Sequence, residues 1–300
     1  MPSFRCQDPL GLNDFKGKRN IINLLKALLA EFIGTLILVF LGCGTATKSL
    51  KLMEDQLKDA KNRTNGDGVP IPAAVIHISL AFGFAVTCIA VGLGHVSGGH
   101  VNPAVTVGFL ATGKIKIIRG LLYVVVQHIG AIVGAGILEA AVPGTPLGAN
   151  MLLEGVGVAG GFIMEFTATF VLVLIVCGCC DPGRHDIHGS IPLIVGLTVA
   201  VGHLLTIGYT TCGINPARSI APVVISPKNA TKDFWIYIVA PYLGGLLGAV
   251  LYWLLFQAAD LAAVPAEEPE KTPSTAPMVA NKVPDEEGEA VADSSGNIES

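Results

Sequence analysis

The sequence predicts an all-α membrane protein in which six transmembrane helices and two re-entrant half-helices form an inverted repeat. Of its 300 residues, 51% are hydrophobic and only 14% are charged, which excludes an ordinary soluble domain. The chain contains six apolar runs of about 20 residues or more, the length of helix that crosses a hydrocarbon core of about 30 Å. It also contains the triplet Asn-Pro-Ala twice, beginning at Asn102 and at Asn215.

The six apolar runs are long and uninterrupted, which indicates helices rather than the alternating strands of a membrane β-barrel. They cover approximately residues 21–46, 73–94, 115–142, 156–180, 190–209 and 233–257. The segment before them, 1–20, has neither the apolar core nor the small-residue cleavage site of a signal peptide. From the basic residues near the spans, we expect residues 1–20 to form a cytoplasmic N-terminus.

The spacing of the motifs predicts that the chain is an internal repeat. Aligning Asn215 with Asn102 also places Gly196 on Gly83, at an offset of 113 residues. The matching segments that precede each triplet indicate two similar halves. The two halves cover approximately residues 21–142 and 156–257.

The first connection of the repeat accounts for a change in the offset. The segment 164–178 ("MEFTATFVLVLIVCG") matches 30–44 ("AEFIGTLILVFLGCG") at an offset of 134, because the connection 47–71 is longer than its counterpart 181–189. Three spans, an odd number, separate equivalent points of the two halves. The second half is therefore inverted relative to the first.

Each Asn-Pro-Ala triplet begins a short helix, because Asn is a favoured N-cap and Pro is favoured at the first helical position. The expected helices, 102–112 and 215–225, each have eleven residues and a length of about 16 Å, which is half a bilayer. Entering from opposite faces, their N-termini would meet at the midplane. The irregular segments before them are acceptable only where they line a wet cavity or are buried in protein, so the sequence predicts a central aqueous path.

The meeting point of the two helices favours neutral solutes over ions. Each Asn oxygen caps backbone N–H groups, which leaves the side-chain NH₂ groups of Asn102 and Asn215 as donors for a passing water molecule. Each helix N-terminus also carries about half a positive charge. At about 4 Å and an effective dielectric constant of about 20, a charge of about +1 costs a cation about 4 kcal/mol.

The paired motifs resemble the aquaporin, or major intrinsic protein, family over approximately residues 21–257. The resemblance implies a passive channel for water that excludes ions and protons, a homotetramer with one pore per subunit, and a narrow filter beyond the motifs. No enzymatic activity, cofactor, metal ion or nucleic acid is implied, and the partners are water and the lipid bilayer. The pore motifs are Asn102, Pro103, Ala104, Asn215, Pro216 and Ala217.

By the same resemblance, four residues make up the selectivity filter: Phe82, His203, Cys212 and Arg218. Glycerol-conducting members usually have Asp after the Arg and a small residue in place of the His, whereas this chain has Ser219 and His203. The resemblance therefore favours the water-selective branch, although Val223 stands where that branch usually has a smaller residue.

Three charged residues inside the predicted membrane segments have two interpretations each. Arg218 is costly in a membrane and is a functional candidate, with a structural salt bridge as the alternative. Glu31 and Glu165 occupy matching places in the repeat. They suit a proton relay, or they accept backbone N–H groups from the re-entrant segments; we favour this bracing, which resembles the family's use of these positions.

Several classes of function remain open at this point. An aquaglyceroporin-like channel for small neutral solutes and a secondary transporter share the expected architecture, because transporters also combine inverted repeats with broken helices. A junction or scaffold protein, in which the C-terminal tail is the working part, is a third class. The seven cysteines lie mostly in apolar spans without metal-ligand spacing, which favours buried side chains over a metal site.

The orientation is predicted from the basic residues near the spans. Nine basic residues lie on the side that holds both termini and seven lie on the opposite side, which favours cytoplasmic termini. We expect the plasma membrane as the location. Two acceptor sequons, at Asn62 and Asn229, then fall on the outer side, and Asn62 is a candidate glycosylation site. The segment 258–300 is expected to be a disordered cytoplasmic tail; from residue 261 onward it holds nine acidic residues and two lysines.

Overall fold

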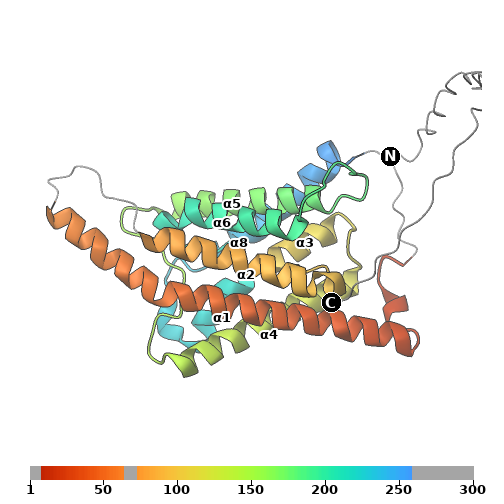
Figure 1. The fold of residues 1–300 in the computed structure, drawn as a ribbon, viewed down its shortest axis with the longest axis horizontal. Helices are drawn as coiled ribbons and strands as arrows, with labels where there is room; N and C mark the ends of the chain where they lie inside the picture. Colours follow the sequence, from red (N-terminus) through yellow and green to blue (C-terminus); the bar gives the residue numbers. More distant parts are fainter. Residues whose placement is uncertain (1–7, 64–72, 259–300) are drawn as a thin grey trace, which may run out of the picture. The chain divides into compact units, whose positions relative to one another are not determined.

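The computed structural model describes residues 8–63 and 73–258, which are helical with irregular connections and contain no strand in these ranges (Figure 1). The α-helices are α1 (Lys18–Arg63), α2 (Ala73–Ser97), α3 (Pro103–Ala111), α4 (Ile117–Ala141), α5 (Val158–Cys179), α6 (Ile191–Thr210), α7 (Pro216–Ile225) and α8 (Ile236–Leu251). Two short 3-10 turns, η1 (Leu12–Phe15) and η2 (Pro227–Asn229), and a π-helical turn, η3 (Tyr252–Phe256), complete them.

Six helices are long and apolar enough to cross a membrane, which confirms the predicted fold class. They are Lys18–Thr47 within α1, the whole of α2, α4, α5 and α6, and Ile236–Phe256 formed by α8 and η3. The other two, α3 with 9 residues and α7 with 10, are about 14 Å and 15 Å long and reach only halfway through a bilayer. The chain is therefore a multi-pass membrane protein.

Helix α1 is longer than the sequence analysis expected. The predicted connection at 47–71 begins as helix, and α1 ends only at Arg63, beyond the ends of its neighbours (Figure 1). The segment 48–63 ("KSLKLMEDQLKDAKNR") has no Gly or Pro and is rich in strong helix formers, so the helix continues after the apolar run ends. Asn62 lies in this last turn; its side chain and the Thr64 of its sequon are outside the described residues.

The contacts between helices follow the internal repeat. In the first half α1 packs against α2 and α4, and in the second half α5 packs against α6 and α8. The halves meet where α2 contacts α6. Each short helix also packs against the last long helix of the opposite half, α3 against α8 and α7 against α4. The two halves are interlocked rather than placed side by side.

Glycines at equivalent positions allow close helix crossings in both halves. A Cβ atom on Gly130 of α4 would overlap the carbonyl oxygen of Phe32 on α1, and a Cβ atom on Gly244 of α8 would overlap that of Phe166 on α5. Phe32 and Phe166 differ by 134 residues, the offset already found between the first and fourth spans. Gly130 and Gly134 on α4, and Gly244 and Gly248 on α8, form Gly-x-x-x-Gly segments that are thus equivalent packing sites.

The contact between α2 and α6 depends on two further glycines. A Cβ atom on Gly83 would lie 2.7 Å from the carbonyl oxygen of Gly196, and one on Gly196 would overlap Thr87 and the Gly83 carbonyl. The two residues that the repeat aligns therefore lie against each other at the junction of the halves. No larger side chain fits there without separating the helices.

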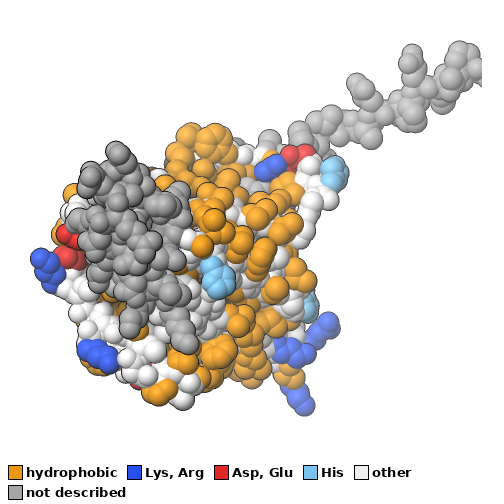
Figure 2. Space-filling model, turned by 60° about the vertical axis from the view of Figure 1, so that its left-hand side comes forward, with side chains coloured by type: hydrophobic (Ala, Val, Ile, Leu, Met, Phe, Trp, Pro, Cys, Tyr) orange, Lys and Arg blue, Asp and Glu red, His pale blue; other side chains and the backbone are white. Residues whose placement is uncertain are grey.

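Large hydrophobic side chains cover the outer faces of the long helices. Phe84 on α2 is 54% exposed and Val201 on α6 is 59% exposed. Figure 2 shows such side chains over much of one face, with Lys and Arg side chains at its margins. An apolar belt with charges at its edges is what a bilayer requires.

Candidate functional site

A cavity of about 300 Å³ runs through the centre of the helical bundle. Helix α2 lines it at every fourth residue with Phe82, Val86, Ala90 and Gly94, and α6 does so with Ile191, Val195, Val199 and His203. A spacing of four keeps these residues on one face of each helix, and twelve residues span about 18 Å. The cavity is therefore an elongated passage with largely apolar walls.

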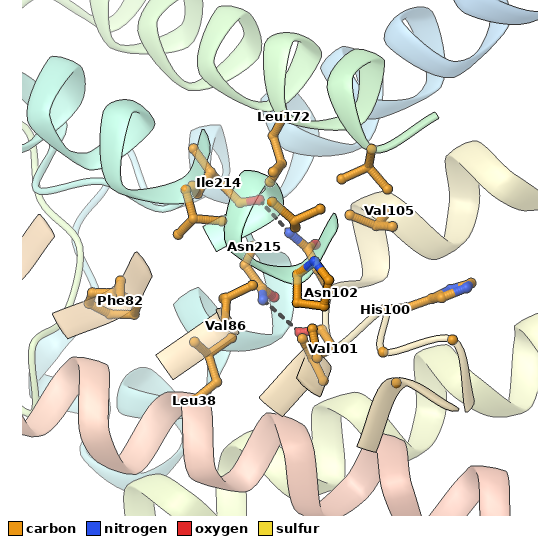
Figure 3. A pocket seen from close by; sticks show the side chains of 18 of the residues that line it. Leu38, Phe82, Val86, His100, Val101, Asn102, Val105, Leu172, Ile214 and Asn215 are labelled. Atoms are coloured by element: carbon orange, nitrogen blue, oxygen red, sulfur yellow. Dashed lines mark hydrogen bonds between the residues drawn. The ribbon is translucent and has the colours of Figure 1, made fainter. Parts of the chain in front are cut away.

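The two Asn-Pro-Ala motifs lie at the middle of this passage, where Asn102 and Asn215 both line it (Figure 3). The side-chain oxygen of Asn102 accepts a hydrogen bond from the backbone N–H of Ala104 at 2.9 Å. That of Asn215 accepts from Ala217 at 3.1 Å and Arg218 at 3.2 Å. Each Asn is thus the N-cap of a short helix that begins at the passage.

The two motifs also bind each other, which the sequence analysis did not foresee. Asn102 Nδ2 donates to the carbonyl oxygen of Ile214 at 2.9 Å, and Asn215 Nδ2 donates to that of Val101, also at 2.9 Å (Figure 3). One N–H of each amide is therefore occupied, where we had expected both to face a passing molecule. Only the second N–H remains for a solute in the passage.

Val101 and Ile214 have unusual backbone conformations. Their φ angles are +41° and +44°, in the left-handed region that β-branched residues rarely adopt. This turns their carbonyl oxygens to the opposite Asn side chain. The sequence signal was the branched aliphatic residue before each triplet, but nothing local in it predicts a positive φ.

Glu31 binds the irregular segment before α3. It is fully buried on α1. One carboxylate oxygen accepts from Ser97 Oγ at 2.7 Å and the His100 N–H at 2.9 Å, and the other accepts from the Val101 N–H at 2.7 Å and Gln127 Nε2 at 2.8 Å. All four bonds are made to an acceptor of full negative charge, which makes them stronger than bonds between neutral groups.

Glu165 has the equivalent position before α7 and is also fully buried. Its Oε1 accepts from the Gly213 N–H at 2.8 Å and from the Thr210 hydroxyl, and its Oε2 accepts from the Ile214 N–H at 2.7 Å. Each carboxylate thus holds the N–H of the residue with positive φ in its own half. The carbonyl of that residue is held by the Asn of the other half.

One end of the passage is narrowed by three of the four predicted filter residues. The rings of Phe82 and His203 are stacked, with centroids 4.3 Å apart and an interplanar angle of 23°. The guanidinium carbon of Arg218 lies 5.3 Å from the centre of the Phe82 ring, within the range of a cation–π contact. All three side chains are at most 2% exposed, so they face one another in a buried constriction.

The constriction offers both donors and an acceptor to a solute. His203 Nδ1 lies 2.9 Å from the carbonyl oxygen of Val199, which requires the proton on Nδ1 and leaves Nε2 as an acceptor. Arg218 Nη1 donates to Asn150 Oδ1 at 2.9 Å. Among the described residues, Arg218 Nε and Nη2 and His203 Nε2 have no hydrogen-bond partner, so they remain for a solute.

The salt bridge considered for Arg218 is not found among the side chains that the structure describes: none of their carboxylates lies within 4.0 Å of its guanidinium. The partner is instead Asn150, which sequence reasoning missed. Asn150 lies in the connection between α4 and α5, and its Nδ2 donates to the Cys212 carbonyl oxygen at 2.9 Å. No motif in that connection marks it.

Cys212, the fourth predicted filter residue, differs from the other three. It is fully buried and has a φ of +58°, but it is not one of the residues that line the passage. Its backbone, rather than its thiol, takes part through the bond from Asn150. The structure therefore brings Phe82, His203 and Arg218 together and leaves the thiol outside their cavity.

The opposite end of the passage opens into a second hollow of about 820 Å³. The two hollows share the lining residues Gly98, His100, Phe109 and Cys180. The second hollow also has basic residues, among them Lys114 and Arg119. The passage therefore adjoins a wider hollow that is partly lined by basic side chains.

The sequence matches the family described as Major intrinsic protein over residues 18–252. Aquaporin FA-CHIP of Pelophylax lessonae is 39% identical over 230 residues, which cover 76% of this chain and 81% of that protein. Aquaporin-1 of Homo sapiens is 40% identical over 230 residues, with coverages of 76% and 80%. Aquaporin-4 of Homo sapiens is 38% identical over 234 residues, with coverages of 77% and 67%.

A solved structure is also similar to this one. The X-ray structure of the aquaglyceroporin from Plasmodium falciparum superimposes with a TM-score of 0.64 at 22% sequence identity, and the match covers 77% of this chain and 96% of that chain. At this identity the likeness extends to the fold alone.

Proposed function

We propose that this chain, which belongs to the major intrinsic protein family of aquaporins, is a passive water-selective channel that excludes ions and protons. Members of this family are channels in lipid membranes and not enzymes. The observation that carries the selectivity proposal is the constriction formed by Phe82, His203 and Arg218. The Asn-Pro-Ala motifs at the middle of the passage support the exclusion of ions.

The constriction suits water because it is small and offers both donors and an acceptor. Water can accept from Arg218 and donate to His203 Nε2 at once. The stacked rings of Phe82 and His203 occupy the space that the carbon backbone of a polyol needs. A glycerol-conducting channel is the alternative. Replacing the His203 ring with a small side chain is expected to let glycerol pass through the constriction.

Ion exclusion is supported by the two short helices. The N-termini of α3 and α7 both begin at the passage, and together they present about +1 charge there. At about 4 Å and an effective dielectric constant of about 20, this charge opposes a cation by about 4 kcal/mol. The free N–H groups of Asn102 and Asn215 bind a water oxygen and turn its hydrogens away, which interrupts a chain of water molecules that would conduct protons.

The contacts of Glu31 and Glu165 favour bracing over a proton relay. Both carboxylates accept two backbone N–H groups from the irregular segment of their own half. A relay would need a carboxylate that gains and loses protons, and protonation here would weaken these bonds. The observation favours a channel over a proton-coupled secondary transporter.

The remaining properties of the channel are proposed from the family and the sequence. We expect a channel domain at 21–257, a homotetramer with one pore per subunit, cytoplasmic termini and a plasma-membrane location. The excess of basic residues on one side supports this orientation. The tail that begins at 258 is proposed as the cytoplasmic extension, and all of it except Ala258 is outside the described residues.

The proposal is tested by stopped-flow light scattering of proteoliposomes under sorbitol and then glycerol gradients. We expect rapid shrinkage in both, without glycerol re-swelling. His203→Ala should keep water flux and add re-swelling in glycerol. His128→Ala is a matched control, because His128 Nδ1 makes the same contact to a carbonyl four residues earlier, at 2.7 Å, but does not line the passage. Fast glycerol re-swelling by the unaltered chain would contradict water selectivity.

A further inference from the structure

Residues 8–17, which precede α1, are folded onto the start of α4. The backbone N–H groups of Ile117 and Ile118 donate to the carbonyl oxygens of Pro9 at 3.0 Å and Leu10 at 3.2 Å. A helix leaves its first N–H groups without partners of its own, so residues 8–17 satisfy two free donors of α4. We call residues 8–17 the docked segment.

Both acidic side chains of the docked segment are engaged within the protein. Asp8 accepts hydrogen bonds from three backbone N–H groups of the turn that follows it, at 2.7–3.1 Å. Asp14 is 7% exposed and forms ion pairs with Lys116 and Arg119. Neither carboxylate is therefore left to neutralise a basic side chain on the outer surface of the segment.

Three basic side chains at the end of the docked segment lack an acidic partner. Lys16, Lys18 and Arg19 are all exposed, and none has a carboxylate within 4.0 Å among the side chains that the structure describes. They follow one another closely where the segment enters α1. This surface is therefore cationic, and the described part of the chain does not neutralise it.

The same segment exposes three large apolar side chains. Leu10 is 48% exposed, Leu12 51% and Phe15 47%. Leu10 adjoins the apolar belt of the long helices, because its carbonyl oxygen binds the N–H next to Ile117, where an exposed stripe that continues at Leu121 begins. Apolar side chains beside cations at the edge of such a belt are typical of a segment that lies in the membrane interface.

We propose that the docked segment, together with the first turn of α1, binds anionic phospholipid headgroups of the adjoining leaflet. Its three apolar side chains contact the boundary of the hydrocarbon core, and the three basic side chains bind headgroup phosphates and carboxylates. Each Lys or Arg near an anionic lipid surface strengthens binding about fivefold. A second copy of the chain would bring the same cations to a two-fold contact, so charge favours lipid as the occupant.

The test uses the full chain in nanodiscs that contain both phosphatidylserine and phosphatidylcholine, one of them as a photoreactive analogue in each experiment. Adducts are mapped to peptides by mass spectrometry. Phosphatidylserine should label residues 8–19 about fivefold or more above phosphatidylcholine, and high salt should remove this preference because it screens exposed charges. Equal labelling by the two lipids at low salt would overturn the proposal. Absence of lipid adducts on these residues would show that protein covers the segment, which would overturn it as well.

Substitutions separate the two parts of the surface. Lys18→Gln with Arg19→Gln should remove the preference for phosphatidylserine, whereas the matched pair Lys228→Gln with Lys232→Gln, exposed in the connection between α7 and α8, should keep it. A preference that survives loss of Lys18 and Arg19 would contradict the assignment.

The apolar part is tested by Leu12→Ser combined with Phe15→Ser. This change should lower labelling by both lipids, because contact with the hydrocarbon boundary does not depend on headgroup charge. Unchanged labelling would show that the segment does not reach that boundary. These results do not depend on which solute the channel conducts, nor on its orientation, because both leaflets of a nanodisc have the same lipids.

Discussion

Asn102 and Ile214 are joined by a hydrogen bond of 2.9 Å across 112 positions of the sequence. The reciprocal bond joins Asn215 to Val101 across 114 positions. Each Asn therefore does two things at once: its oxygen caps its own short helix, and its nitrogen holds the irregular segment of the other half. A substitution at either Asn changes both the local helix and the contact between the halves.

Asn102→Asp should convert the middle of the passage from excluding cations to admitting them. Asp is as good an N-cap as Asn, so α3 should still form. The added negative charge opposes the positive helix ends, and at about 4 Å and a dielectric constant of about 20 it is worth about 4 kcal/mol, or roughly a thousandfold in cation occupancy. Currents across planar bilayers measure this. Asn102→Ser, which caps the helix without adding a charge, is the control and should carry no cation current.

Glu31→Gln should destabilise the protein although it preserves the shape of the side chain. Glu31 accepts four hydrogen bonds, and the NH₂ group of a glutamine would face N–H donors. Each buried N–H left without an acceptor costs about 1–3 kcal/mol. Thermal unfolding in detergent checks the loss against Glu154→Gln, an exposed carboxylate. Equal melting temperatures for the two variants would show that Glu31 does not hold this segment.

Gly196→Ala should separate α2 from α6. The new methyl group would overlap Thr87 and the backbone of Gly83, and overpacking of this kind costs about 1–3 kcal/mol. Gly208→Ala on the same helix meets nothing within 4 Å and should stabilise α6 by about 0.5–1 kcal/mol. Unfolding measured for both variants should therefore shift in opposite directions.

Asn150→Ala should weaken solute exclusion without touching the cavity wall itself. The substitution removes the acceptor for Arg218 Nη1 and the donor to the Cys212 carbonyl, so Arg218 is no longer fixed over Phe82. A hydrogen bond to a charged group contributes about 1.5–3 kcal/mol. Glycerol flux into proteoliposomes should rise above that of the unaltered chain. Asn20→Ala removes exposed amide bonds to Asn13 and Lys16 at the start of α1 and should leave that flux unchanged.

The segment before α1 should come loose in acid. Asp14 accepts hydrogen bonds from Lys116 and Arg119, both at 2.8 Å. Partial burial raises the pKa of the Asp14 carboxyl, but the bonds from these two side chains outweigh it and hold the pKa below its ordinary value. Because the folded pKa is lowered, this stabilisation is present above about pH 4 and is lost as the pH falls further.

Hydrogen exchange of the Ile117 and Ile118 amides reports this docking, because they donate to the Pro9 and Leu10 carbonyls. At neutral pH, Asp14→Asn should reduce their protection about two- to fivefold, the range of partly exposed ion pairs. Asp186→Asn removes a separate exposed pair and should not change it. Unchanged protection in Asp14→Asn would mean that the backbone bonds alone hold the segment.

The sequence predicts the spans well because membrane crossing needs only a long apolar run. The predicted run 73–94 corresponds to α2, Ala73–Ser97, and the predicted run 190–209 corresponds to α6, Ile191–Thr210. The end of α1 was missed because hydropathy marks where a helix leaves the membrane and not where the helix stops. Polar helix formers carry it on to Arg63.

The site was predictable where local chemistry determines it. Capping by Asn102 depends on its nearest neighbours and follows from the triplet. The positive φ of Val101 and the role of Asn150 depend on residues more than 60 positions away, so no window of sequence contains their cause. Likewise, the filter position predicted for Cys212 did not reveal that its carbonyl oxygen accepts a hydrogen bond from Asn150, while its thiol is not part of the cavity wall.

The reciprocal Asn bonds can form only after the second motif has been synthesised. During translation at about 5–20 residues per second, the second motif emerges roughly 6–23 s after the first. Throughout that interval the Val101 carbonyl oxygen has no Asn215 amide to accept from, so the loop of the first half is completed only once the second half has been made.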